Sequence, residues 1–332
     1  MKHLFNRIVA STLVALVALA PAFAMAQIWN PTKAIMFVGP VAPGSSNYLI
    51  ARMLSEKLPA KLGQPVIVDN RPGVSGFVGT ASAALSAPDG HAIVIVPNDV
   101  YMAPILTPKA GGANFNIIKK FSPILSAGSA PMLIVASPSI NVKTPNELVV
   151  YLNKNVATNY GSPGTGSHIN IASEVLQRST GTQLNHMSYR GVLRAVNAVL
   201  AGELPISIVE LAKDAPRIAT GKLVPAGLVE KQRAEFLSTV AKMTESGIAG
   251  VETAVFFQIL APSATPAAAN QRLDTDINAV LARSEFMDKM RGMGVQITGG
   301  IFGDAAKLAR DTPARNQQVV KDLNITVECV TS

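Results

Sequence analysis

The sequence predicts an α/β fold with parallel-rich sheets flanked by helices. Short apolar runs alternate along the chain with segments that repeat apolar residues at helical spacing. The apolar runs lack the polar alternation of strands that face solvent on one side, which is typical of parallel strands buried between helices. Alternation of strands with helices is in turn the pattern of α/β folds.

Six apolar runs are predicted to be buried strands. They are Ile35–Val38, Val66–Val68, Ile93–Val96, Met132–Ala136, Ile206–Val209 and Phe256–Leu260. Three apolar stripes at helical spacing predict helices that pack on these strands. The stripes are Leu49, Ile50, Met53, Leu54 and Leu58; Ile169, Ala172, Val175 and Leu176; and Leu193, Val196, Val199 and Leu200. We expect all three stripes to belong to the core.

The N-terminus has the pattern of a secretory signal peptide. Lys2 and Arg7 lie in a short basic region, and the apolar run Ile8–Leu19 follows. Ala24 and Ala26 then place small residues where a signal peptidase cleaves. A membrane anchor is the alternative, but it needs about 20 apolar residues. We therefore expect a signal peptide at residues 1–26 and a mature protein in the periplasm.

Length and composition predict a soluble protein of about two domains. Removal of 26 of the 332 residues leaves 306, which is about two domains of usual size. The net charge of +8 favours anionic solutes through its long-range field. A basic cluster with interleaved aromatic residues is missing from the sequence, so nucleic acid is not an expected partner. The single cysteine, Cys329, rules out an intramolecular disulfide.

Three loops lie where a parallel sheet would place a ligand, between a strand and the next helix. They are Gly39–Tyr48, Gly161–His168 and Ser188–Val192. The first two combine glycine with hydroxyl or amide side chains at a predicted helix start. Such loops can turn backbone N–H groups toward a carboxylate or phosphate. Plain helix capping explains the same residue types, because serine, threonine and asparagine are preferred N-caps.

The second loop has the glycine spacing of a nucleotide-binding loop but lacks its essential cation. Gly161 and Gly166 are correctly spaced, yet Ser167 and His168 stand where lysine and a hydroxyl residue are required. Without the lysine the phosphate clamp is missing. The sequence therefore does not indicate an ATP-dependent activity.

An enzyme is not indicated either. The G-x-S-x-G nucleophile motif is absent, and the histidines of the mature chain, His91, His168 and His186, lack metal-ligand spacing. His91 is expected to be exposed in a turn, and His168 begins a helix at a candidate loop. We predict neither a catalytic residue, a metal nor a cofactor. A periplasmic hydrolase remains an alternative.

From about Pro31 to Leu308 the chain resembles the Bug receptors, the substrate-binding receptors of tripartite tricarboxylate transporters. Pro40–Ser46 is similar to the family's P-F-A-P-G-G-S segment, and Phe257–Pro266 to its F-x-x-x-A-P-x-x-T-P segment. The other matching segments, in order, are Ala51–Arg52, Leu62–Val66, Asp69–Gly73, Gly76–Gly79, Pro88–Gly90, Asn159–Ser162, Ser167–His168, Tyr189–Gly191 and Gly221–Leu223. So many ordered matches are more specific than any single glycine loop.

The resemblance implies a two-lobed periplasmic binding protein that closes on a small organic acid. Two crossover segments, near Ser126–Pro131 and Ala254–Gln258, would join lobe 1 (27–128 and 255–332) to lobe 2 (129–254). The implied partners are the membrane subunits of the transporter, and the receptor would be a monomer. A receptor of the same fold that signals to a sensor kinase is the alternative.

The loops and the resemblance together predict the residues that bind the ligand. They are Ser46, Asn47, Tyr48, Asn98, Ser162, Thr165, Gly166, Ser167, His168 and Arg190. Carboxylate recognition would use backbone N–H groups, hydroxyls and ordered water. Tyr48 and Arg190 would select among ligands.

Several positions depart from the family's pattern. Ser45 replaces a glycine, Tyr48 an aspartate, Lys120 an aspartate, and Val209 and Glu210 an Asp-Asn pair. Because Tyr48 carries no charge to balance a buried ammonium, we expect an amine-free carboxylate, with aromatic acids among the options. The alternative is that Tyr48 only packs the first helix.

Processing by signal peptidase predicts a mature N-terminus at Gln27. N-terminal sequencing of protein recovered from the periplasm measures this directly. Retention of the Ile8–Leu19 run in a membrane fraction would contradict the prediction.

Overall fold

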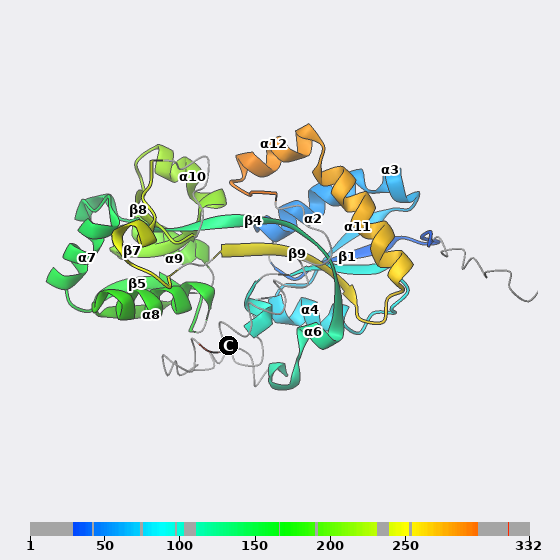
Figure 1. The fold of residues 1–332 in the computed structure, drawn as a ribbon, viewed down its shortest axis with the longest axis horizontal. Helices are drawn as coiled ribbons and strands as arrows, with labels where there is room; N and C mark the ends of the chain where they lie inside the picture. Colours follow the sequence, from blue (N-terminus) through cyan, green and yellow to red (C-terminus); the bar gives the residue numbers. More distant parts are fainter. Residues whose placement is uncertain are drawn as a thin grey trace, which may run out of the picture.

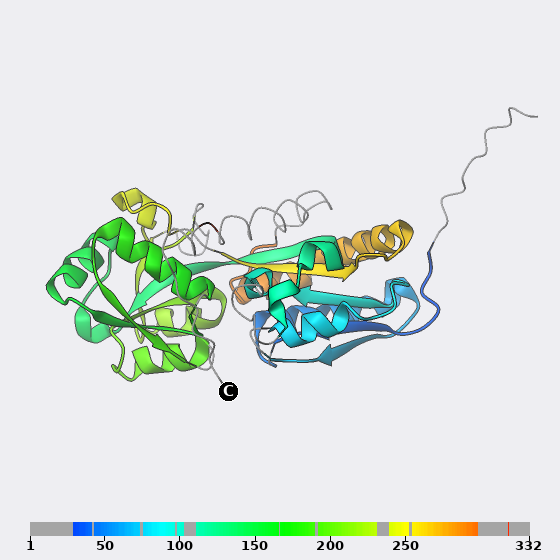
Figure 2. The same cartoon turned by 90° about the horizontal axis from the view of Figure 1, so that it is seen from below.

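The computed structural model describes residues 29–41, 43–73, 76–96, 98–102, 111–165, 167–189, 192–230, 239–251, 254–297 and 318. Figure 1 shows two α/β halves, bridged by the long strand β4 (Phe121–Ala136), with β9 (Ala254–Pro262) running beside it. The view from below in Figure 2 separates the same two halves along the long axis of the molecule. The predicted signal peptide lies outside the described residues.

The first half is built around β1, which has a parallel neighbour on each side. Its strands are β1 (Ile35–Gly39), β2 (Val66–Asn70) and β3 (Ala92–Val96), together with β9. Its helices are α2 (Ser46–Lys57), α3 (Pro59–Leu62), α4 (Phe77–Ala83), α6 (Ile117–Lys120), α11 (Ala267–Leu281) and α12 (Ser284–Gly292), with 3-10 turns η2 (Asn98–Met102) and η4 (Gly112–Asn114). Both ends of the described chain therefore contribute to this half.

The second half repeats the arrangement around β5, which is parallel to its neighbours β6 and β7. Its strands are β5 (Thr158–Ser162), β6 (Leu184–Ser188), β7 (Ile206–Glu210) and β8 (Val224–Leu228). Its helices are α7 (Pro145–Lys154), α8 (His168–Thr180), α9 (Val192–Leu200) and α10 (Leu211–Ala219), with 3-10 turns η5 (Pro138–Ile140) and η7 (Met243–Ser246).

Strand β4 belongs to both halves. Its first part pairs antiparallel with β9, from Phe121 opposite Pro262 to Pro131 opposite Ala254. Its last part, from Met132 onward, pairs with β7 and β8. The resulting strand order is β2-β1-β3-β9-β4-β7-β5-β6, with β8 beside β4. The segment that the sequence predicted as the first crossover is thus the middle of one continuous strand. The exact lobe boundaries stay a prediction.

All six predicted strands form, but two of them are not parallel. Met132–Ala136 lies in β4 and Phe256–Leu260 lies in β9, and both strands pair only antiparallel with their described neighbours. Their apolar character comes from burial on both faces, because helices cover the sheet. Strand direction has no effect on that pattern, so the expectation of parallel pairing was wrong here.

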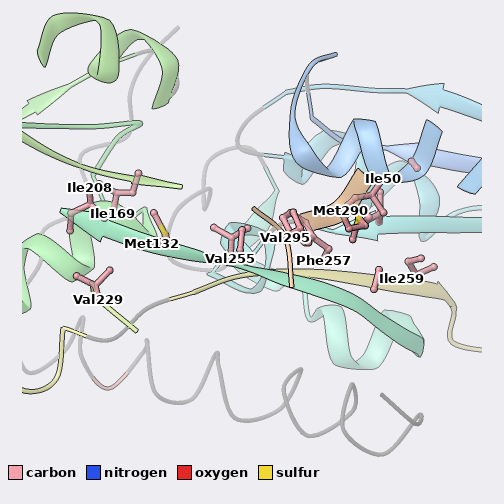
Figure 3. Packing of buried hydrophobic residues seen from close by; sticks show 14 of the residues in the cluster. Ile50, Met132, Ile169, Ile208, Val229, Val255, Phe257, Ile259, Met290 and Val295 are labelled. Carbon is pink, nitrogen blue, oxygen red and sulfur yellow. The ribbon is translucent and has the colours of Figure 1, made fainter. Parts of the chain in front are cut away.

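Buried apolar side chains form a core that continues from one half into the other. Ile50 and Phe257 belong to the same cluster as Met132 and Ile208, and Val255 lies between them beside the crossing strands. Figure 3 shows this cluster following β4 and β9. Apolar side chains therefore pack the connection between the halves along the crossing strands. Among the described residues, none of the helices is both long enough and apolar enough to cross a membrane.

The chain returns to the crossing strands after α12. Ser129 in β4 forms a bridge with Gln296 through two backbone hydrogen bonds of 2.8 Å. This contact requires glycine at position 128, because a Cβ there would lie 2.5 Å from the carbonyl oxygen of Gln296. β4 also bulges between Ser126 and Gly128.

Replacing Gly128 with alanine should destabilise the protein by about 1–3 kcal/mol, because the backbone carbonyl of Gln296 must move. Urea unfolding measures the change. Gly292→Ala is the matched control, since a Cβ at that position meets nothing within 4 Å and alanine favours the helix by about 0.5–1 kcal/mol. Equal stability of Gly128→Ala and the wild type would contradict the proposed close approach.

Candidate ligand-binding site

The carboxyl ends of the parallel strands of the two halves converge at the junction between the halves. β1 and β3 lead into α2 and η2 of the first half, and β5 and β7 lead into α8 and α10 of the second. Hydrogen bonds join these segments across the junction. α/β folds bind ligands at such strand ends, so this junction is the candidate site.

The first contact across the junction joins α2 to the end of β7. Ser46, the first residue of α2, donates from Oγ to Glu210 Oε1 at 2.5 Å. Both residues are buried, with 2% and 7% of their surface exposed. Glu210 lies opposite Met132 in the β4–β7 pairing, immediately beyond the crossing point. A carboxylate is stabilised at this position because the N-terminus of a helix carries partial positive charge.

The second contact is the converse of the first, because a carboxylate of the first half meets a helix of the second. Asp99 Oδ1 lies 2.8 Å from His168 Nδ1 and accepts from the His168 backbone N–H at 3.3 Å. His168 is the first residue of α8. Burial acts to raise the pKa of Asp99, but the charge and hydrogen bonds of His168 outweigh it and lower that pKa.

Of the predicted residues in the first loop, Asn47 has the environment of a ligand-binding group. It is 5% exposed, and its side-chain Nδ2 has no hydrogen-bond partner among the described residues. Tyr48 is half-buried, and its backbone N–H donates to Ser45 Oγ at 3.2 Å. Ser45 therefore caps α2, as the capping alternative predicted.

Ser162 and Ser167 lie together in the second half, but their hydroxyls already have partners. Ser162 is completely buried; its Oγ donates to the Gly164 carbonyl at 3.0 Å and accepts from the Gly164 N–H at 3.1 Å. Ser167 Oγ caps α8 by accepting from the Asn170 N–H at 3.2 Å. Their use as ligand donors stays a prediction. Thr165 is half-buried nearby.

Three predicted site residues cannot be placed. Gly166 and Arg190 lie outside the described residues, as does the side chain of Asn98, whose backbone opens η2. The next residue in η2, Asp99, is the one that contacts His168.

Ser162 also lies 2.6 Å from His186 Nε2, the kind of pair that a hydrolase would need. The Ser162 hydroxyl lies within hydrogen-bonding distance of both His186 Nε2 and the Gly164 carbonyl, at 2.6 and 3.0 Å, and its single hydrogen can point to only one of them at a time. His186 also stacks on Tyr160, and burial lowers its pKa. The pair joins β5 to β6 within the second half.

His91 is buried, at 8% exposure, so the expectation that it is exposed was wrong. Its Nε2 accepts from the Thr32 N–H at 3.1 Å, and its ring packs on Trp29. The residues Asp89 and Gly90 predict a surface turn. The pairing of β1 with β3 brings Thr32 and Trp29, which precede β1, over the imidazole. That tertiary contact leaves no pattern in the residues around His91.

Sequence reasoning did not identify Asp99 as a residue of the junction, and it named Glu210 only as a departure from the family's pattern. A signal for both was present, because each follows a predicted buried strand at its carboxyl end, where α/β sheets place functional side chains. Within the described part of the chain, histidine, cysteine, aspartate and glutamate do not gather into any group of three that could hold a metal ion.

Two α/β halves that share one strand and meet at the carboxyl ends of their parallel strands define a periplasmic binding protein fold. A model of the family described as "Tripartite tricarboxylate transporter family receptor" matches residues 50–325. Since this match covers most of the chain, the protein belongs to the tripartite tricarboxylate transporter receptor family. The resemblance seen in the sequence motifs is thereby confirmed.

Individual relatives agree with this assignment. BugT of Bordetella pertussis is 25% identical over 265 residues, which cover 80% of this chain and 81% of BugT. The solved structure described as a periplasmic transporter is 27% identical, with a TM-score of 0.81 over 90% of this chain and 99% of that one. R. palustris Rpa4515, solved with adipate, is 25% identical, with a TM-score of 0.80 over 89% and 99%.

A third carboxyl group lies beside the crossing strands and is held in its neutral form. Burial raises the pKa of Glu230 to about 8, although a backbone hydrogen bond from Met132 opposes the rise. Its Oε1 has no partner among the described residues. The folded protein therefore keeps this proton to a higher pH than the unfolded chain, whose pKa is near 4.5.

This difference makes stability fall as the pH rises from about 4.5 to about 8, because the unfolded chain releases the proton first. Glu230→Gln should remove that loss. In urea unfolding, the variant should gain more than about 1 kcal/mol over wild type between roughly pH 5 and pH 8.5. Glu203→Gln, the same substitution at an exposed position, is the matched control. A pH-independent difference for Glu230→Gln would contradict the raised pKa.

Proposed function

We propose that the protein is a periplasmic receptor that binds a small organic carboxylate at the junction of its halves and delivers it to the membrane subunits of a tripartite tricarboxylate transporter. The observation that carries this proposal is membership of the receptor family. The relative Rpa4515, which is 25% identical, was solved with adipate, and this supports a carboxylate as the ligand class. A cleaved signal peptide and a monomeric state are parts of the same proposal.

The chemistry of Asn47 fits a carboxylate. Its amide nitrogen offers two hydrogens, and a buried donor without a partner costs about 1–3 kcal/mol. A ligand oxygen that accepts from this nitrogen recovers that cost on binding. The N-terminal turn of α2, in which Asn47 lies, adds a partial positive charge that favours an anion.

The buried Glu210 carboxyl bears on the charge of the ligand. The expectation of an amine-free acid rested on the missing carboxylate at Tyr48, but Glu210 supplies a buried carboxylate in the same junction. A ligand group next to Glu210 is therefore favoured if it donates a hydrogen bond, as a hydroxyl, ammonium or protonated carboxyl does. A second ionised carboxylate at that point would be repelled.

Calorimetry against adipate, malate, citrate, benzoate, phthalate, aspartate and glutamate tests the ligand class. We expect micromolar or tighter binding of at least one of these acids, with the acid recovered intact. Binding of malate or citrate alone would keep the amine-free expectation, whereas binding of aspartate or glutamate alone would keep the receptor function and indicate that Glu210 balances an ammonium. A failure of every carboxylate, with binding of a different solute class, would overturn the proposed ligand class.

Asn47→Asp tests whether a ligand carboxylate lies beside the amide. The change replaces both donors with an acidic side chain, which repels an anionic ligand at that point. The affinity for the best acid of the panel should fall by roughly 5- to 150-fold, which corresponds to about 1–3 kcal/mol. Asn153→Asp, at an exposed position of α7, should bind as the wild type does. Unchanged affinity in Asn47→Asp, with folding confirmed by circular dichroism, would place the carboxylate elsewhere.

A further inference from the structure

We propose that Glu210 and Asp99 are two reciprocal latches that hold the halves together in the absence of ligand and thereby set how readily the receptor opens. Each latch joins a carboxylate of one half to the N-terminus of a helix in the other: Glu210 to α2 through Ser46, and Asp99 to α8 through His168. The proposal concerns the ligand-free protein, so it does not depend on which solute is bound.

The Glu210 latch is held rigidly in its own half. Val209 and Leu211 on either side are buried in the second half's core, and Glu210 pairs in register with Met132 of β4. The carboxylate therefore cannot follow Ser46 if the halves separate. Opening of the junction must break this 2.5 Å hydrogen bond.

The Asp99 latch is held rigidly in the first half. Val100 and Tyr101 follow it in η2 and are buried in that half's core. The Tyr101 hydroxyl donates to Gln258 of β9, which anchors η2 to the crossing strands. Asp99 is thus presented to α8 by a fixed support, and its side chain and that of His168 are only 11% and 14% exposed.

Both contacts distinguish the closed state from an open one. Hydrogen bonds to charged groups are stronger than those between neutral groups, and low exposure limits the competition from water. In each latch the helix dipole adds to the hydrogen bond. An interaction that exists in only one of two states biases the equilibrium by its full differential strength. The latches therefore favour closure before any ligand arrives.

The convergence of the strand ends at the junction explains why each half contributes one carboxylate and one helix N-terminus to the latches. The parallel strands of each half end at the junction, so each half offers there both helix N-termini and strand-end carboxylates.

A distance measurement on ligand-free protein tests the proposal. Spin labels on Leu85→Cys and Val150→Cys, at positions that are 86% and 53% exposed in the first and second halves, report opening by pulsed electron paramagnetic resonance. The substitution Cys329→Ser removes the single natural cysteine, so the spin label attaches only at positions 85 and 150. Unfolding and refolding before labelling removes any carried solute. The wild type should show one short-distance population. Glu210→Ala or Asp99→Ala should each raise the open-to-closed ratio by about tenfold or more.

A double-mutant cycle separates a latch from a merely structural role. Ser46→Ala should open the protein as Glu210→Ala does, and the double variant should open it no further, because both changes remove one contact. Ser207→Ala is the matched control: it removes a buried hydrogen bond to the Gly161 carbonyl within the second half and should leave the distances unchanged. Unchanged distances in both Glu210→Ala and Asp99→Ala, or strictly additive effects of Ser46→Ala and Glu210→Ala, would overturn the proposal.

Discussion

The antiparallel pairing of β4 with β9 is the constraint on which the rest of the structure depends. It inserts β9, from late in the chain, between β3 and β4 and so completes the first sheet. The same β4 continues into the second half and pairs there with β7 and β8. Because one strand serves both sheets, the orientation of the halves follows from the twist and bulges of β4. The continuous apolar core along the crossing strands stabilises that orientation.

This orientation determines the chemistry of the junction. Each half has its parallel strands ending at the same place, and each strand end leads into a helix or a 3-10 turn. Helix N-termini with partial positive charge therefore face strand-end carboxylates of the other half. Ser46 with Glu210, and His168 with Asp99, are the observed result. The same electrostatic environment that accepts these internal carboxylates suits an anionic solute beside Asn47.

The fold was more predictable from sequence than the site. Apolar runs and helical stripes located six strands and three helices, since burial leaves a direct pattern in the residues. Strand direction was not encoded in that pattern, as Met132–Ala136 and Phe256–Leu260 show. Ser46 and His168 were found because glycine-rich loops mark helix starts. Their partners were missed because contacts between residues such as Ser46 and Glu210, 164 positions apart, depend on the tertiary arrangement.

The position of β9 between β3 and β4 has a consequence for the order of assembly. Until residue 262 has been synthesised, β3 and the first part of β4 lack the strand that lies between them. A nascent chain would therefore present two apolar strand edges, which are prone to wrong pairing and aggregation. Completion of the first sheet must wait for β9, whereas the strands β5 to β8 of the second half are all present once residue 228 has been synthesised. Such a chain benefits from being kept unfolded until its last strand is available.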